Sequence, residues 1–180
     1  MKKNFFLMLL LLTSISFYGQ KYITKTGNLK FEASVASFEE VAAENKNTSA
    51  VLEASTGEVA VLALMKGFRF KVALMEEHFN ENYMESDKFP KATFKGKIED
   101  FDLEKTVNAK SCRISGDLTL HGKTRKITTT AKITRSGNTI TLAGNFEVTP
   151  ADFAIEIPGL VRKKVADKIQ VTYNLPLMNK

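Results

Sequence analysis

Apolar and polar residues alternate with a period of two along most of the chain. The first such run places Leu29, Phe31, Ala33 and Val35 on one face, with mostly polar or charged residues between them. Further alternating runs occupy 58–64, 68–74, 93–98, 116–120, 126–133, 139–148 and 168–177. A strand with one buried face has this period, so the pattern predicts roughly eight strands.

Turn residues and glycines separate or interrupt these runs. Ser136-Gly137-Asn138 is a hairpin signal, and Gly96, Gly116 and Gly144 lie inside alternating runs, as in a bent sheet. Only two segments favour helices, residues 38–44 and a stretch within 74–85. Two short helices cannot cover eight strands. The sheet therefore packs on a second sheet or closes on itself.

The first twenty residues, MKKNFFLMLLLLTSISFYGQ, have the layout of a secretory signal peptide. Two lysines precede an apolar run from Phe5 to Leu12, and small and polar residues follow. This run is too short to span a bilayer comfortably. We therefore expect residues 1–20 to be removed and residues 21–180 to form one domain that is periplasmic or secreted.

Charge and cysteine content narrow the function classes. The formal net charge is +6, but the basic residues are spread along the expected strands, so no nucleic-acid partner is predicted. The single cysteine, Cys112, cannot form an internal disulfide. A domain of about 160 residues must then be stabilised by its core.

One helical segment carries candidate chemistry. His78 and Glu81 are three positions apart and share a helix face, a spacing that can bind a metal or serve acid–base catalysis. Further ligands are not evident, because the other histidine, His121, follows a strand and is expected to satisfy a backbone group. Architecture is the simpler interpretation, with Phe79 packing the helix over one end of the fold. We expect no metal, no cofactor and no catalysis, with an enzyme acting on a hydrophobic substrate at the His78–Glu81 helix as the alternative.

Two stretches resemble the YceI-like family. HFNENYMESDKFPKATFKGKI, residues 78–98, is similar to the family's short helix, aromatic–proline pair and following strand. ISGDLTLHGKTRKITTTAKI, residues 114–133, is similar to its hairpin, with matches at Gly116, Leu118, Leu120, His121, Gly122 and Thr124. The resemblance implies a mainly β fold, a single antiparallel, lipocalin-like β-barrel of about eight strands with one or two short helices. It also implies an exported protein that holds a polyisoprenoid chain, such as a quinone tail, for carriage or storage.

Eleven apolar residues on expected inward faces or on the helix are candidates for lining that chain. They are Phe31, Phe68, Phe70, Val72, Leu74, Phe79, Phe94, Leu118, Leu120, Phe146 and Phe153. A solid core built from the same residues is the alternative, and the barrel would then have a structural or stress-related role. Each methylene-sized group of a bound chain would contribute about 0.8 kcal/mol. Together with the resemblance, this favours an apolar lumen.

A basic run follows EIPGLV at Arg162-Lys163-Lys164. Such a run is a solvated loop, or it meets anionic membrane headgroups or the polar head of a ligand. From the resemblance, the expected partner is an isoprenoid lipid or quinone. The basic run adds transient contact with a membrane surface as a second candidate interaction. The sequence predicts no particular oligomeric state.

The signal-peptide layout makes a direct prediction. Intact-mass measurement of the protein from its native compartment should show a chain that begins near Gln20 or Lys21. Retention of Met1 would contradict the predicted export.

Overall fold

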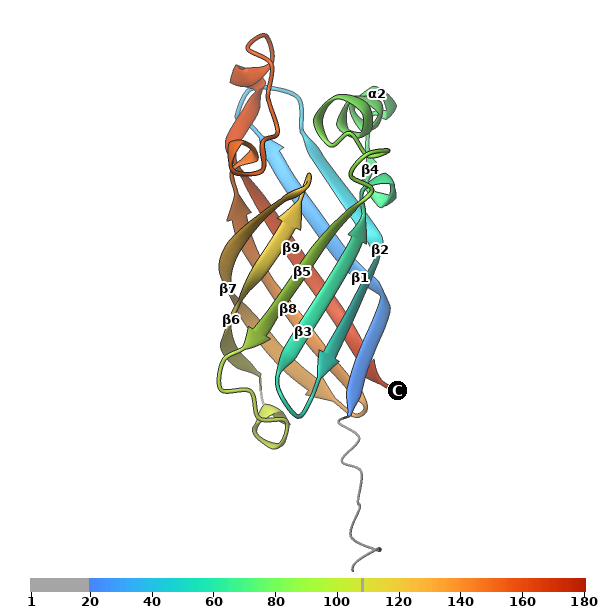
Figure 1. Ribbon diagram of the computed structural model, residues 1–180, viewed down its shortest axis with the longest axis vertical. Coiled ribbons are helices and arrows are strands. Elements are labelled where there is room, and N and C mark those ends of the chain that lie inside the picture. The colour runs from blue at the N-terminus through green and yellow to red at the C-terminus, as the bar shows by residue number, and fades with distance from the viewer. Residues whose placement is uncertain (1–19, 108) are drawn as a thin grey trace, which may run out of the picture.

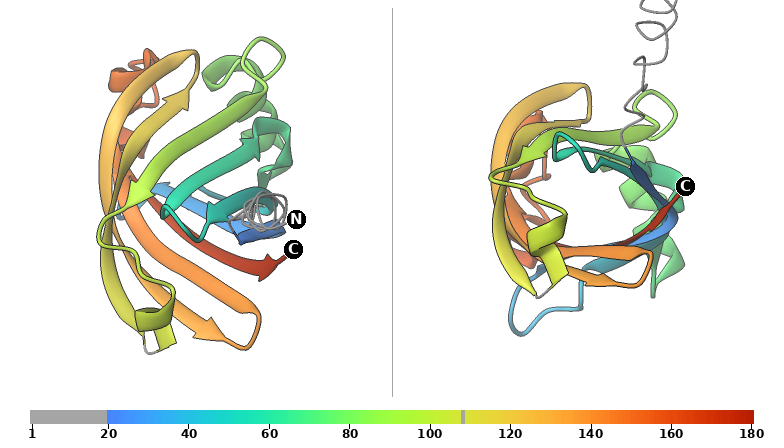
Figure 2. Two further views of the ribbon diagram at one scale, coloured as in Figure 1. Left: turned by 60° about the horizontal axis from the view of Figure 1, so that its bottom comes forward. Right: turned by 90° about the horizontal axis from the view of Figure 1, so that it is seen from below.

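Eight strands close into an antiparallel barrel in the computed structural model, which describes residues 20–107 and 109–180 (Figures 1 and 2). The order around the barrel is β1-β9-β8-β7-β6-β5-β3-β2, and β1 pairs with β2 to close the ring. The strands are β1 (Lys21–Ser34), β2 (Ala42–Glu53), β3 (Glu58–Leu64), β5 (Lys91–Ile98), β6 (Lys110–Leu120), β7 (Lys123–Ser136), β8 (Thr139–Val148) and β9 (Val165–Asn179). The predicted barrel of about eight strands is confirmed. The predicted signal peptide lies outside the described residues except for Gln20.

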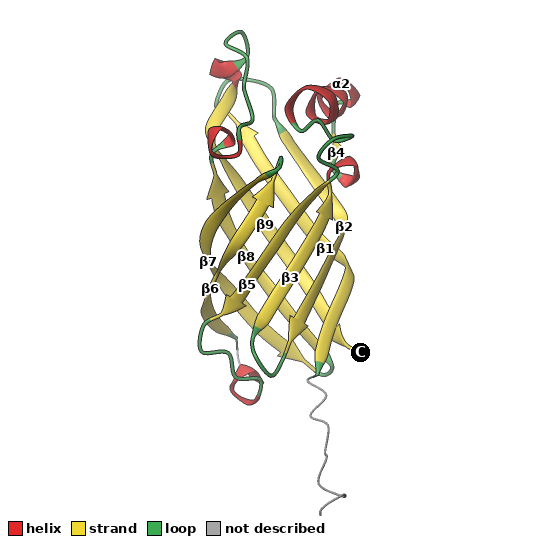
Figure 3. Ribbon diagram, viewed as in Figure 1, coloured by secondary structure: helices red, strands yellow, loops and turns green. Residues whose placement is uncertain are grey.

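Short elements gather at the two ends of the barrel (Figure 3). At the upper end of Figure 1 lie β4 (Arg69–Phe70), which pairs with β2 outside the ring, and the helix α2 (Ala73–His78). A π-helical turn, Phe79–Tyr83, continues α2. The 3-10 turns are Met65–Gly67, Glu104–Val107, Pro150–Phe153 and Arg162–Lys164. Among the described residues, no helix combines the length and the hydropathy needed to cross a membrane.

Strand β3 shows how the alternating pattern becomes an inside and an outside. Val59 and Ala63 are buried with 4% and 2% exposure, whereas Leu62 and Leu64 between and after them are 36% and 56% exposed. Successive side chains of a strand point to opposite faces, so exposure alternates along β3 even though leucines occupy its outer face.

Two glycines allow an aromatic ring to lie flat against the inner wall. Gly96 and Gly116 face each other across β5 and β6, and the ring of Phe94 lies over both. A Cβ at Gly116 would come within 2.4 Å of backbone atoms of Gly96 and Lys95. Side chains at these positions would push the ring and the neighbouring strand away, so glycine there sets the local curvature of the sheet.

The lower end of the barrel is a filled core. Seven apolar side chains with at most 2% exposure fill it from six different strands: Tyr22, Leu52, Ile98, Ile133, Ile140 and Leu177, with Leu142 just above them. Cys112 belongs to the same cluster. This packing closes the barrel at the end where the described chain begins and ends (Figure 1).

The expected helix at 38–44 does not form. Ser37 adopts a positive φ of 74°, the chain reverses, and Val41 donates its backbone N–H to the Ser34 hydroxyl at 3.1 Å. Strand β2 then begins at Ala42 and runs through the polar stretch around Asn45. Asn45 is buried at 1% exposure because its amide donates to the Leu64 carbonyl at 2.9 Å. An asparagine favours loops in a sequence pattern, and the pattern does not show that a tertiary hydrogen bond will bury it in a strand.

The expected strand at 68–74 shrinks to the two residues of β4. Only Arg69 and Phe70 find partners, on β2, and Val72 already precedes the helix α2. The carboxylate of Glu76 accepts hydrogen bonds from the Phe70 backbone N–H at 3.1 Å and the Arg69 guanidinium at 2.6 Å. These bonds hold the helix against β4. Alternation alone cannot show that an extended segment lacks a neighbouring strand.

The close approach at Gly116 predicts the effect of a single methyl group. Gly116→Ala should destabilise the barrel by roughly 1–3 kcal/mol, since the clash is with backbone rather than with a mobile side chain. Gly159→Ala is the matched control, because no atom lies within 4 Å of a Cβ there. Urea unfolding of both variants measures the difference, and equal stabilities would contradict the packing described here.

Candidate functional site

An apolar cavity of about 200 Å³ occupies the upper part of the barrel. We call it the upper compartment. Its walls come from β1, β3, β5, β6, β8 and β9 and from the segments that lie over the upper end, including Phe79 after α2 and Phe153 in the 150–153 turn. An engineered apolar cavity of about 150 Å³ binds benzene. The upper compartment is therefore large enough to hold part of an apolar ligand.

Four phenylalanines pack together beside this compartment. The rings of Phe31, Phe68, Phe70 and Phe79 form a cluster whose centroids are 5.1 to 5.8 Å apart. Aromatic pairs at such distances contribute about 0.5–1.5 kcal/mol each beyond their burial. This aromatic cluster attaches the α2 segment to β1, so it forms the apolar cover of one side of the upper compartment.

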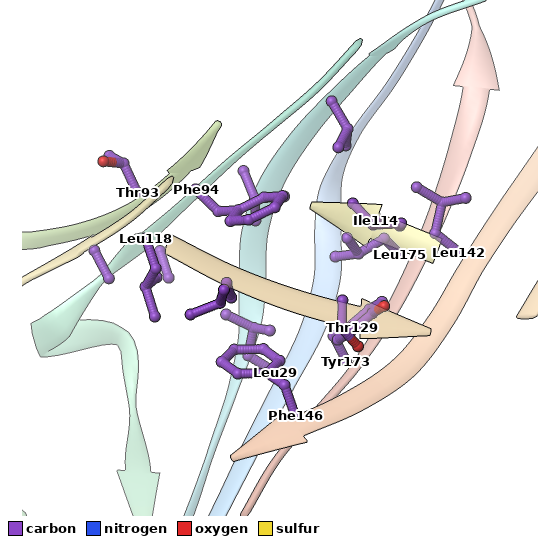
Figure 4. A pocket seen from close by; sticks show the side chains of 15 residues that line it. Leu29, Thr93, Phe94, Ile114, Leu118, Thr129, Leu142, Phe146, Tyr173 and Leu175 are labelled. Atoms are coloured by element: carbon purple, nitrogen blue, oxygen red, sulfur yellow. The ribbon is translucent and has the colours of Figure 1, made fainter. Parts of the chain in front are cut away.

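A second cavity of about 80 Å³, the lower compartment, lies deeper in the barrel (Figure 4). Phe94, Leu118, Leu142 and Leu175 point into it from different strands, and Phe146 borders it as well. Both compartments share the wall residues Leu29, Ala63, Ala92, Leu118 and Phe146. The two spaces are therefore adjoining parts of one apolar interior above the filled core.

Tyr173 contributes a hydroxyl to the wall of the lower compartment. Its ring lies over Gly144, and the phenol oxygen has no hydrogen-bond partner among the described residues. Burial raises the pKa of the Tyr173 phenol, and a contact with Thr129 opposes that shift in part. The hydroxyl of Thr129 is already engaged, since it donates to the Asn145 carbonyl at 2.6 Å. Tyr173 thus stays a neutral hydrogen-bond donor in a wall that is otherwise almost wholly apolar.

His121 fastens three segments at the upper end. It forms the β6–β7 turn with Gly122, both with positive φ, as a two-residue hairpin of this kind requires. Its Nδ1 lies 3.1 Å from the Phe153 carbonyl oxygen, and its Nε2 lies 2.9 Å from Oε2 of Glu85. The ring also packs on Phe89 with centroids 4.4 Å apart. The backbone group that His121 satisfies thus belongs to the distant 150–153 turn rather than to its own turn.

Eight of the eleven candidate lining residues border the two compartments. They are Phe31, Phe68, Phe79, Phe94, Leu118, Leu120, Phe146 and Phe153. The other three do not. Phe70 packs behind Phe31 and Phe79, Val72 precedes α2, and Leu74 is 56% exposed on α2, because residues 71–78 leave the barrel wall. Contact of the eight with a lipid stays a prediction.

The His78–Glu81 pair lies outside both compartments. His78 and Glu81 are exposed at the end of α2 and in the π-helical turn. Across residues 20–107 and 109–180, no three His, Cys, Asp or Glu side chains gather as a metal site would require. The alternative of an enzyme built on this helix therefore gains no supporting geometry.

Several wall residues escaped the sequence prediction. Ile155 and Ile157 follow the 150–153 turn, and Val165, Ile169 and Val171 come from the upper part of β9. Ile155 and Ile157 alternate with polar residues and could have been predicted to face inward. They were not, because Pro158 follows them and indicates a loop. Small residues such as Ala63 and Ala92 give no signal at all, since their role is to leave space.

A closed antiparallel barrel with a filled base, an apolar interior cavity and covering segments at the other end defines the class of lipocalin-like β-barrels. The family model of the YceI-like domain matches residues 13–177, so the chain belongs to the YceI-like family. No match is found among curated proteins.

Solved structures share the fold at low sequence identity. A polyisoprenoid-binding domain from Saccharophagus degradans has a TM-score of 0.77 at 16% identity, covering 90% of this chain and 99% of its own. BcnA from Burkholderia cenocepacia has a TM-score of 0.70 at 18% identity, covering 83% and 95%. The YceI protein from Campylobacter jejuni has a TM-score of 0.64 at 17% identity, covering 81% and 88%.

The Glu85–His121 contact predicts a pH-dependent contribution to stability. The hydrogen bond from His121, helped by Lys88, lowers the pKa of the Glu85 carboxyl below its ordinary value. A carboxyl with a depressed folded-state pKa stabilises the fold above its unfolded pKa of about 4.3, and this contribution is lost as the pH falls through the folded-state pKa. Glu85→Gln should therefore melt below the wild type at pH values near neutral and converge with it in acid.

Thermal melts of both proteins across this pH range measure the effect. Glu81→Gln is the control, because Glu81 is exposed and lies on the neighbouring turn without an ion pair among the described residues. A wild-type advantage over Glu85→Gln that is unchanged in acid would contradict the assigned cause.

Proposed function

We propose that this protein is an exported, non-catalytic lipid carrier that holds an isoprenoid chain in the barrel interior. The observation that carries the proposal is the pair of adjoining compartments with almost wholly apolar walls above a filled core. Such a space offers burial to an apolar chain and little to a polar substrate. The driving force is hydrophobic, and it requires neither metal nor covalent chemistry.

Membership of the YceI-like family supports this proposal. The structural neighbour from Saccharophagus degradans is a polyisoprenoid-binding domain, and its barrel covers nearly the whole of the present one. The chemistry of an isoprenoid chain also suits the wall. Its branched methyl groups fit between phenylalanine rings and aliphatic side chains, and each methylene-sized group buried contributes about 0.8 kcal/mol.

The size of the two compartments limits the length of chain that the interior can hold. Volumes of about 200 and 80 Å³ together approach the lower end of the usual range for ligand pockets, roughly 300–1,000 Å³. A short chain fits as the interior stands. A longer one, such as a quinone tail, requires the aromatic cluster of Phe31, Phe68, Phe70 and Phe79 to shift, or it projects past the upper end.

Between carriage and storage, we infer carriage from the expected export together with the filled lower end of the barrel. A protein exported into an aqueous compartment meets lipids at membranes, and a barrel with one filled end takes up and releases its chain at the other. We infer a quinone or a related isoprenoid lipid as cargo, held in the periplasm or outside the cell, with transient contact with a membrane surface.

Narrowing the passage between the compartments tests the proposal. Ala63 is buried at 2% exposure and lines both of them. Ala63→Leu places three more carbon atoms in shared space, so it should displace most of a co-purified lipid while leaving the unfolding free energy unchanged or slightly higher. Solvent extraction with mass spectrometry and urea unfolding measure the two quantities.

Ala60→Leu is the matched control, since Ala60 lies on the same strand and is exposed on its outer face. It should retain the wild-type lipid content. Absence of any long-chain lipid in the wild type, after purification from its native compartment, would overturn the binding function and leave the filled-barrel alternative.

A further inference from the structure

The loop that joins Phe153 to β9 carries the most exposed large apolar side chain that the structure describes. Leu160 is 91% exposed, against 48% for Phe38 and 56% for Leu74 at the same end of the barrel. It follows Pro158 and Gly159, and a Cβ at Gly159 would meet no atom within 4 Å. A single exposed apolar side chain is common on protein surfaces, so the significance of Leu160 depends on the charges beside it.

Local hydrogen bonds hold this tip in shape. The backbone N–H groups of Val161 and Arg162 both donate to the Pro158 carbonyl at 3.0 Å, and the N–H of Lys164 donates to the Val161 carbonyl at 2.8 Å. A cleft of about 460 Å³ lies between residues 149–157 and 162–167. The tip is therefore a formed turn that stands away from the barrel wall, at the upper end of Figure 1.

The charge of the turn is uniformly positive. Residues 158–164 contain Arg162, Lys163 and Lys164 and no acid. Arg162 makes a loose, exposed ion pair with Asp167 at 3.8 Å, and the two lysines have no ion pair within the described part of the chain. A leucine separated only by Val161 from three exposed cations matches a surface that presents phosphate groups above an apolar layer.

The same loop borders the interior cavity. Ile155 and Ile157 line the upper compartment, and both also line the cleft beneath the tip, together with Pro150 and Val165. Four apolar residues therefore connect the loop to the cavity wall, although Glu156, Arg162 and Asp167 also line the cleft. A surface that receives Leu160 would lie against the end of the barrel through which a chain passes.

The opposite side of this end is less suited to an anionic surface. The α2 segment exposes Leu74, but Glu77 and Glu81 are exposed beside it. The β1–β2 loop exposes Phe38 next to Glu39, with Glu40 paired to Lys71. Exposed Glu156 and Asp167 flank the turn of Leu160, but residues 158–164 themselves carry three cations and no acid, so charge favours contact through this turn.

We propose that residues 158–164 dock the barrel on a membrane that contains anionic lipids. Leu160 inserts among the acyl chains near the headgroups, and Arg162, Lys163 and Lys164 contact the lipid phosphates. This docking rests on the proposed carrier function and names the surface on which the chain would be exchanged. Its test does not depend on the cargo.

Vesicle flotation tests the docking. The probes are vesicles of phosphatidylcholine alone and vesicles in which about one third of the lipid is phosphatidylglycerol. The wild type should float with the anionic vesicles only, and raising the salt to physiological strength should weaken the binding because exposed charges are screened beyond about 8 Å. Leu160→Ser should reduce the partition coefficient about tenfold or more. Neutralising all three cations to glutamine should reduce it on the order of 100-fold, about fivefold for each residue.

Two control variants match these changes at the lower part of the barrel. Met178→Ser alters an apolar side chain that is 62% exposed near the chain end, and Lys97→Gln, Lys110→Gln and Lys132→Gln together remove three exposed cations. Both should keep wild-type partitioning. Loss of binding by the controls to the same degree as by the loop variants would overturn the proposal, as would failure of the wild type to bind anionic vesicles.

Lipid content, measured by extraction from the same preparations, separates this outcome from that of the carrier function. Loop variants that keep their extracted lipid but no longer float support docking by the loop. A wild type that contains lipid but does not float overturns the docking alone. A wild type that floats through Leu160 but holds no lipid supports the docking and removes the carrier function.

Discussion

Closure of the sheet on itself is the constraint on which the rest of the structure depends. Strand β1 pairs with β2 on one side and with β9 on the other, so the first and last strands complete the ring. Once closed, the barrel has no free edge within the ring, and every inward side chain competes for one enclosed volume. The contents of that volume decide whether the barrel is a solid core or a container.

The two ends resolve that competition differently. The lower end combines Tyr22 with branched aliphatic residues from several strands, and their exposures fall to 2% or below. The upper end places rings at the periphery and small residues, Ala63 and Ala92, in the wall between the compartments. Filling one end stabilises the fold without a ligand. The upper end can therefore contain a cavity without unfolding the barrel.

The segments over the upper end are held by few but specific contacts. His121 joins the β6–β7 turn to Glu85 and to the Phe153 carbonyl, while Phe31, Phe68, Phe70 and Phe79 attach α2 to β1. Both attachments involve side chains rather than strand pairing, so they can rearrange without opening the ring. A chain longer than the present cavity calls for such a rearrangement. The basic turn at 158–164, for which we propose contact with a membrane surface, lies at the same end.

The local pattern of the sequence determined where most strands lie. The tertiary structure decided which side chains pack in the core, border the cavity or join distant segments. Alternation identified most of the strands and six of the residues that border the cavity, because side-chain direction in a strand follows directly from sequence position. The choice of a closed barrel came from the resemblance to the YceI-like family. Alternation failed at 68–74, where extension without a partner strand gave way to α2. The helix expected at 38–44 does not form, because the chain reverses at Ser37 and enters β2 at Ala42. The role of His121 depends on residues more than thirty positions away, and that of Ala63 depends on space that no residue fills. Partners and empty volume are set only when the ring closes, so no local signal could have shown them.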